Sequence, residues 1–202
     1  MNERDKTYHR DNLRGDLLQA GRAHIAEHGH QSLSVRTLAQ SVGVSPGAPY
    51  HHFRDRRALL MALALDGYEE LNSRAAAATG KPGSPEDKLI ALAMNFVDFA
   101  MSDPRLLELM YDSELANPAP DPAVLTYQQV GQSALLAQVR AARPDDSESE
   151  ASVRVIALWS SIYGFASLRR RQMIQPFEPK GMTEEAVALR TMTLAVQAAL
   201  RD

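Results

Sequence analysis

Residues 34–60 (SVRTLAQSVGVSPGAPYHHFRDRRALL) place the strongest constraint on how this chain can fold. A short segment with apolar residues at helical spacing comes first, and Gly43 then makes a turn. Val44 returns an apolar side chain to the core, and Ser45 can cap a second short helix over residues 45–52. This order of elements is the signature of a helix-turn-helix. In that motif the second helix enters the major groove of DNA by its N-terminal half.

The rest of the chain contains several sequence signals for the start of a helix. A Ser or Asp directly before Pro favours a helix start, because the side chain can cap and proline loses no hydrogen bond there. No stretch alternates apolar and polar residues over the length of a strand, so no sheet is predicted. We therefore expect an all-α fold of about nine helices, over roughly residues 8–28, 34–41, 45–52, 55–79, 85–101, 103–112, 122–142, 147–174 and 183–201.

Pro- and Gly-rich connections separate these helices at residues 80–83, 117–120 and 175–181. The helix-turn-helix lies before the first connection, in a small head. We predict two domains, with residues 1–54 as the helix-turn-helix domain and residues 55–202 as a connecting helix followed by a helical body.

Composition indicates the cellular compartment in which the protein works. It has no cysteine, which excludes disulfides and cysteine-based zinc fingers. The N-terminus lacks the apolar core of a signal peptide. The longest apolar stretch, residues 89–101, is broken by Asn95 and Asp98 and is too short to cross a bilayer. We therefore expect a soluble, cytoplasmic protein without a membrane partner.

Charge is distributed unevenly along the chain. Residues 1–60 carry nine Lys/Arg against six Asp/Glu, whereas residues 61–202 carry thirteen against nineteen. A basic head on an acidic body suits a nucleic-acid-binding protein.

The sequence offers no enzyme site. It contains no nucleophile elbow, no Gly-rich phosphate loop and no metal triad. His24 and His28 have the i, i+4 spacing of a metal site, but the sequence places no third ligand beside them. We expect no enzymatic activity, no metal and no cofactor.

The head resembles the DNA-binding domain of the TetR/AcrR family of transcriptional regulators over about residues 10–60. The turn, the cap, the aromatic residues and the start of the following helix match in register. The matching residues are Ala39, Gly43, Val44, Ser45, Gly47, Tyr50, Phe53, Asp55 and Leu59.

The resemblance implies a set of DNA contacts. Tyr50 and His52 would touch phosphates, and Arg36 is the one long donor available for bidentate reading of guanine. Arg56 stands where the family usually has Lys, so a phosphate contact is expected to survive. Pro49 departs from the Leu of many members. The full predicted set is Arg36, Ser45, Pro46, Gly47, Ala48, Tyr50, His51, His52 and Arg56.

The body is rich in Met and aromatic residues, which indicates either core or the wall of a ligand cavity, since such pockets are mostly apolar. The segment from Trp159 to Gly164 resembles a C-terminal domain class of the same family marked by Trp, three residues and then His-Gly. Tyr163 replaces the His here. The predicted effector is a small apolar or aromatic molecule, and its predicted contacts are Met94, Phe99, Met110, Tyr111, Tyr127, Trp159 and Tyr163.

The last two helices carry apolar residues that could form a four-helix interface with a second copy. One small head reads a half-site, and two heads related by two-fold symmetry read a palindrome. The predicted interface residues are Leu158, Ile162, Phe165, Met192 and Val196.

These features predict a homodimeric, ligand-responsive transcriptional regulator, most simply a repressor that binds double-stranded DNA and releases it when an effector binds the body. The alternative is a helical protein with a vestigial head that acts through protein partners without binding DNA.

Overall fold

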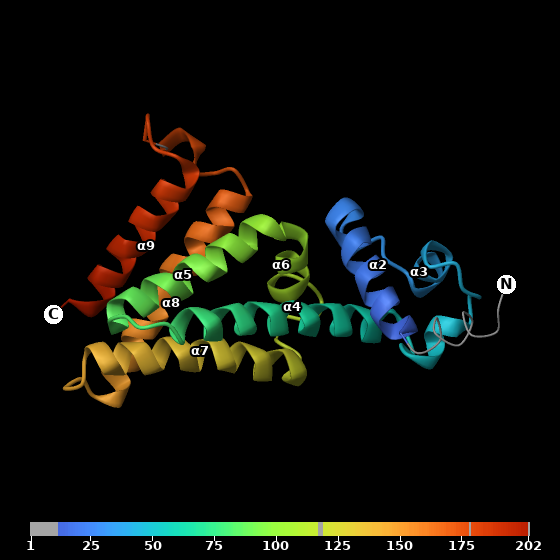
Figure 1. Cartoon of the computed structure of the whole chain (residues 1–202), viewed down its shortest axis with the longest axis horizontal. Helices are drawn as coiled ribbons and strands as arrows, with labels where there is room; N and C mark the ends of the chain where they lie inside the picture. Colours follow the sequence, from blue (N-terminus) through green and yellow to red (C-terminus); the bar gives the residue numbers. More distant parts are fainter. Residues whose placement is uncertain (1–11, 117–118, 178, 202) are drawn as a thin grey trace. The chain divides into compact units, whose positions relative to one another are not determined.

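The computed structural model describes residues 12–116, 119–177 and 179–201, and over these residues it contains α-helices, short 3-10 helices and no strand (Figure 1). The predicted all-α fold is therefore confirmed. The predicted start of the first helix at residue 8 lies outside the described residues, as do residues 117–118 and 178 of the predicted connections. The α-helices are α2 (Leu13–His28), α3 (Val35–Ser41), α4 (Arg56–Thr79), α5 (Pro85–Ser102), α6 (Pro104–Tyr111), α7 (Pro122–Ala142), α8 (Glu148–Arg170) and α9 (Glu184–Leu200), and the 3-10 helices are η1 (Ala48–His51) and η2 (Gln175–Phe177).

The chain forms two compact units that alternate along the sequence. Unit 1 takes in the chain up to Gly67 and then Arg105–Val124, whereas unit 2 takes in Tyr68–Pro104 and the chain from Leu125 onward. The unit that holds the helix-turn-helix therefore also holds most of α6 and the segment that leads into α7. The predicted boundary between a DNA-binding domain (residues 1–54) and a helical body (residues 55–202) divides the chain by function, and it stays a prediction.

In unit 1, α2, α3 and η1 pack together. A close approach brings α6 onto α4, because a Cβ on Gly67 would lie 2.8 Å from Met110 Sδ and residue 67 has no side chain to prevent it. The core side chains of this unit are at most 4% exposed and include Leu17, Ile25, Leu33, Val35, Leu38, Ala39, Phe53, Leu59, Leu60 and Leu63.

In unit 2, α5, α8 and α9 pack against one another (Figure 1). Ser84 and Asp87 form a capping box at the start of α5, and Thr183 caps α9 by accepting a hydrogen bond from Ala186 N at 3.2 Å. The core side chains of this unit are at most 9% exposed and include Leu89, Leu92, Ala93, Phe96, Val97, Leu158, Ile162, Ala188, Met192 and Val196.

Helix α8 ends at Arg170, earlier than the predicted residue 174. Gln172 has a φ of 58°, in the left-handed region, and its N–H donates to Arg169 O at 2.9 Å. Met173 N donates to Leu168 O at 2.8 Å, which completes the hydrogen-bond pattern of a Schellman motif. Because a glutamine occupies the position that glycine usually takes, this stop has no visible signal in the sequence.

Helix α8 is also long and apolar enough to cross a membrane by length and composition. Its most apolar window of 18 residues has a mean hydropathy of 1.3, and 28% of that window is buried. A single helix of this kind is weak evidence for a span, because the core helix of a soluble protein passes the same test. The prediction of no membrane segment rested on residues 89–101 and overlooked this helix.

Candidate nucleic-acid interface

The turn after α3 has the geometry that the sequence predicted. Ser34 caps α3 by accepting a hydrogen bond from Thr37 N at 3.0 Å. Gly43 has a φ of 69°, in the left-handed region that favours glycine. Val44 N then donates to Ala39 O at 3.0 Å, which fixes the direction in which the chain leaves the turn.

The second element of the motif is a single 3-10 turn, η1, and the predicted α-helix over residues 45–52 is wrong. Pro49 is buried at its second position and has no N–H, so it cannot continue an α-helical hydrogen-bond pattern from residue 45. Gly47 occupies the cap position, and Ser45 is not the side-chain cap that we expected. The bonds that define the turn are Ala48 N to Ser45 O (3.0 Å), Tyr50 N to Gly47 O (3.2 Å) and His52 N to Pro49 O (2.9 Å).

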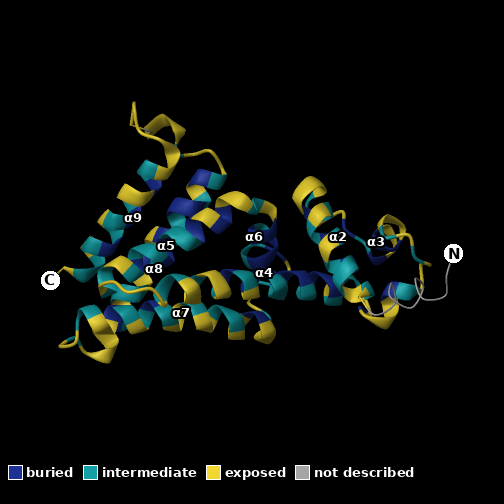
Figure 2. Cartoon of the chain, viewed as in Figure 1, coloured by how far each residue is buried: buried dark blue, intermediate teal, exposed yellow. Residues whose placement is uncertain are grey.

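The surface of α3, the turn and η1 is largely exposed (Figure 2). Tyr50 is 53% exposed despite its aromatic ring, and Arg36 has no hydrogen-bond or ion-pair partner among the described residues. Ala48 is half-buried. The residues of the predicted DNA set that are exposed are Arg36, Ser45, Pro46, Gly47, Tyr50, His51 and His52.

Two further polar side chains lie on the same exposed face of α3, and the sequence prediction missed both. Thr37 and Gln40 follow Arg36 at i+1 and i+4, opposite the buried Leu38 and Ala39. The sequence alone could have predicted that these two residues are exposed, because the apolar positions of a short amphipathic helix define its polar face. Thr37 also exchanges a short hydroxyl contact with Ser34.

Arg56 is engaged by groups within unit 1, and the phosphate contact predicted for it stays a prediction. Its Nε donates to Leu33 O at 2.9 Å and its Nη2 to His30 O at 2.8 Å, so it holds the connection between α2 and α3. Its Nη1 donates to Glu114 Oε1 at 2.7 Å. The guanidinium is therefore committed to backbone carbonyls and a carboxylate within unit 1, where Arg gives a forked set of donors that Lys cannot.

Arg57 extends this network towards the start of α7. Its Nη2 donates to Asp121 Oδ2 at 2.8 Å, and its Nη1 donates to Glu114 O at 3.3 Å. Arg56 and Arg57 together join the first turn of α4 to the segment between α6 and α7. We name this set, with its two carboxylate partners Glu114 and Asp121, the unit 1 clamp.

The charges of the unit 1 clamp shift the titration of both carboxylates. Burial raises the pKa of Glu114, but its hydrogen bond to Arg56 and the neighbouring charges of Arg56 and His30 outweigh burial and leave that pKa below its ordinary value. The pKa of Asp121 is lowered by its backbone hydrogen bond from Ala123 and then by Arg57. Both carboxylates are thus bound more favourably in the charged form.

Acid should weaken the unit 1 clamp. A carboxylate with a lowered pKa contributes stability that is fully present above its unfolded pKa, ordinarily 4.5 for glutamate, and is lost as pH falls through the folded pKa. We expect Glu114→Gln to be less stable than the wild type at neutral pH and to show a shallower loss of stability below pH 4.5, measured by urea unfolding. The exposed Glu69→Gln is the control and should keep the wild-type slope. An unchanged slope in Glu114→Gln would exclude this role.

The histidines of α2 are engaged with one another and with Ser32. The His24 and His28 rings meet edge to face at 4.9 Å, and His24 Nε2 lies 2.9 Å from Ser32 Oγ. Burial, followed by the neighbouring His28, lowers the pKa of His24. The described residues contain no group of three His, Cys, Asp or Glu that could hold a metal ion.

The seven predicted effector contacts fall in both units of the chain, and their role stays a prediction. Met110 and Tyr111 belong to unit 1, whereas the other five belong to unit 2. Phe99 and Met110 are 0% exposed. In unit 2, the half-buried Trp159 lies 4.8 Å from Phe96 and 6.1 Å from Tyr163 between ring centroids. The remaining predicted residues, Met94 and Tyr127, are also half-buried.

The predicted dimer residues face inward, which corrects that choice of residues. Leu158, Ile162, Phe165, Met192 and Val196 are between 0% and 9% exposed within the single chain, because they form the contacts of α8 and α9 with the unit's own core. A partner could meet other side chains of these helices. On α8 the exposed apolar residues Val153 and Ile156 stand on the opposite side, at 57% and 65% exposure.

The all-helical body and the exposed α3–η1 surface are those of a helix-turn-helix regulatory protein. Residues 17–63 match the family described as bacterial regulatory proteins, tetR family, and residues 89–193 match the tetracyclin repressor-like C-terminal domain. The chain belongs to the tetR family, whose members are transcriptional regulators and not enzymes.

Named relatives match part of the chain in sequence. The HTH-type transcriptional repressor Rv1474c of Mycobacterium tuberculosis is 40% identical over 78 residues, which cover 39% of this chain and 41% of the repressor. AcnR of Corynebacterium efficiens, also an HTH-type transcriptional repressor, is 43% identical over 55 residues, 27% of this chain and 29% of its own. The matches thus span well under half the length of these repressors.

Solved structures extend the likeness to the whole fold. A protein with unknown function from Rhodococcus sp. RHA1 is 29% identical, covers 94% of each chain and has a TM-score of 0.78. The TetR family regulator PfmR from Thermus thermophilus has a TM-score of 0.64 at 20% identity, covering 90% of this chain and 97% of its own. The second likeness shows the fold alone.

Proposed function

We propose that this protein regulates transcription by binding duplex DNA through the exposed surface of α3, the turn and η1. The observation that carries the proposal is the pairing of a solvent-facing Arg36 with the exposed Tyr50 and His52 beyond a left-handed glycine turn. Arg36, Thr37 and Gln40 offer donors and acceptors for base edges, and Tyr50, His51 and His52 lie at the end of η1 where a phosphate backbone would run.

The short η1 sets how this surface would read DNA. The exposed residues directly before η1 are Ser45, Pro46 and Gly47, which are small and permit a close approach but supply few base-reading groups. Recognition would therefore rest on Arg36 and its neighbours on α3, on phosphate contacts, and on DNA shape.

Replacing Arg36 by Ala should relax sequence preference. A bidentate contact between arginine and guanine discriminates by about 1–3 kcal/mol, so we expect a roughly 5- to 150-fold loss for the preferred base pair and little loss for duplexes altered there. Competition binding with single-base variants of one duplex measures this. Arg54→Ala is the matched control, since Arg54 is exposed and forms an ion pair with Asp55. A uniform loss across all duplexes would refute base reading by Arg36.

We further propose that the protein acts as a homodimer on a palindromic site, through the outward face of α8 and α9. Val153, Ile156, Ala157, Ser160 and Gly164 recur at helical spacing along α8, and a Cβ on Gly164 would meet no atom within 4 Å. Such a face of small and apolar residues suits close packing against a second helix. On α9, Leu189 and Leu194 are each 48% exposed and supply more apolar surface.

The proposed effector site lies in unit 2 around Trp159, Tyr163 and Phe96, and the effector is a small apolar or aromatic molecule whose binding releases DNA. The half-buried rings of Trp159 and Tyr163 give both apolar area and edges for such a ligand. In the same unit, Gln128 Nε2 donates to the Tyr68 hydroxyl at 2.8 Å, which places a polar group beside apolar surface.

Trp159 is the single tryptophan of the chain, so it reports on this site directly. An apolar aromatic probe such as 1-naphthol should change Trp159 emission with saturation, because the probe would contact the half-buried Trp159 ring. A probe without an aromatic ring at equal concentration is the control. A linear change, equal to that of free tryptophan, would place effector binding elsewhere.

A further inference from the structure

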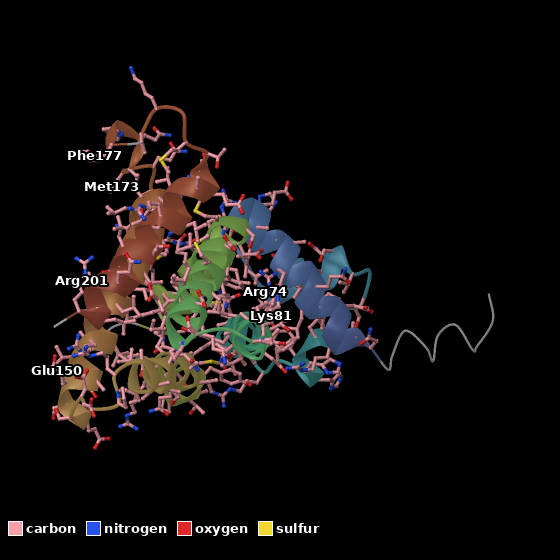
Figure 3. All side chains as sticks on the ribbon, turned by 60° about the vertical axis from the view of Figure 1, so that its left-hand side comes forward. Arg74, Lys81, Glu150, Met173, Phe177 and Arg201 are labelled. Carbon is pink, nitrogen blue, oxygen red and sulfur yellow. The ribbon has the colours of Figure 1, made fainter. Side chains whose placement is uncertain are left out.

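A cavity of about 170 Å³ lies in unit 2 where α8 ends and α9 begins. Figure 3 shows the connection between these helices, on which Met173 and Phe177 are labelled. The lining includes Arg169 and Arg170 of α8, Gln172 and Gln175 of the connection, and Glu184, the first residue of α9. None of the lining residues belongs to the proposed DNA, dimer or aromatic effector surfaces. The cavity is smaller than the roughly 300–1,000 Å³ of pockets for drug-sized ligands, so it suits a compact molecule.

The cavity is built around a buried cation. The Arg169 side chain is 6% exposed, whereas that of Glu184, whose Oε2 lies 2.9 Å from Arg169 Nη2, is 79% exposed. A buried charge is costly unless it is paired. The chain therefore satisfies a buried guanidinium with a carboxylate that reaches in from the surface.

The charged groups that line this cavity are two guanidiniums and one carboxylate. The balance is positive, because two guanidiniums follow each other at the end of α8. Planar guanidinium forks match carboxylate and phosphate oxygens in two parallel hydrogen bonds. The side-chain amides of Gln172 and Gln175 add neutral donors and acceptors to the same wall.

We propose that this cavity binds a small oxyanion, a carboxylate or phosphate compound, through Arg169 and Arg170. Glu184 occupies the ligand's position in the free protein as an internal substitute, and an entering anion displaces it from Arg169. The left-handed Gln172 holds the chain in the turn that brings its side chain to the cavity wall.

The test is calorimetric titration of the whole chain, without DNA, with inorganic phosphate and separately with succinate at fixed ionic strength. We expect saturable binding of at least one probe at one site per chain. Arg170→Gln should weaken it about tenfold or more, because the positive charge at this position and its charge-assisted hydrogen bond to the anion are lost. Glu184→Gln should tighten it, because the competing carboxylate is removed. Arg171→Gln, exposed and outside the lining, should bind as the wild type does.

Arg169→Gln could misfold because it removes a buried ion pair. The proposal is therefore tested with Arg170→Gln and Glu184→Gln, after circular dichroism confirms that both variants keep their helical content. Binding of phosphate alone identifies a phosphate site, and binding of succinate alone identifies a carboxylate site. Absence of saturable binding, or equal affinity in the wild type and both variants, overturns the proposal. The measurement uses no DNA, so its result is independent of the proposed regulatory function.

Discussion

Ile156→Glu is expected to convert the protein from a dimer into a monomer. Ile156 is 65% exposed in the middle of the apolar α8 face, and the neighbouring Val153 is 57% exposed. If that face meets its symmetry copy, the variant would bury two unpaired carboxylates, which costs several kcal/mol and raises the dimer dissociation constant by about 100-fold or more. Light scattering over a dilution series measures the change.

The same variant should also lose most of its affinity for a two-half-site duplex. A linked second head binds at a high effective concentration, and a monomer loses this advantage, which is about 100-fold or more. Val130→Glu is the matched control, because Val130 is a β-branched residue of α7 with 53% exposure. A dimer that survives Ile156→Glu but not Val130→Glu would move the interface to α7.

Arg56→Gln is expected to destabilise the fold strongly and to leave DNA contacts in place. Its guanidinium satisfies the carbonyls of His30 and Leu33 and binds Glu114. Loss of these partly buried hydrogen bonds should cost about 2–3 kcal/mol. For a chain of this size that lowers the melting temperature by roughly 5–10 °C.

Two comparisons separate this structural role from a phosphate contact. Arg54→Gln should cost less than about 0.5 kcal/mol, since Arg54 is exposed and its ion pair with Asp55 is at the surface. In folded Arg56→Gln, the slope of affinity against salt should equal that of the wild type. A slope reduced by about one counterion would show that Arg56 contacts a phosphate.

Local sequence signals predicted most helix starts correctly. Ser84-Pro85, Ser147 and Thr183 begin α5, α8 and α9 as expected, because caps and first-turn residues act within a few positions along the chain. Gly43 likewise predicted its turn. The end of α8 failed because its stop at Gln172 uses a left-handed residue that is not glycine.

The structure differs from the expected sites where contacts join residues that are distant in sequence. Arg56 has the charge of a phosphate-binding residue, but its partners lie 23 or more positions away, at Leu33, His30 and Glu114. Leu158 and Ile162 have the pattern of an interface, but a helix with two apolar faces does not reveal which one the protein itself covers. Pro49 differs from the leucine of many family members in the sequence. Only the structure shows that the second helix of the motif is shortened there to the 3-10 turn η1.

Binding of the whole chain to DNA from its own upstream region tests the central proposal most directly. At physiological ionic strength we predict that a palindromic duplex from this region binds about 1,000-fold or more tightly than a scrambled duplex of equal length and composition. Arg36→Ala should reduce that ratio. Equal affinity for both duplexes, at low as well as physiological salt, would contradict the proposal and favour a head that acts through protein partners.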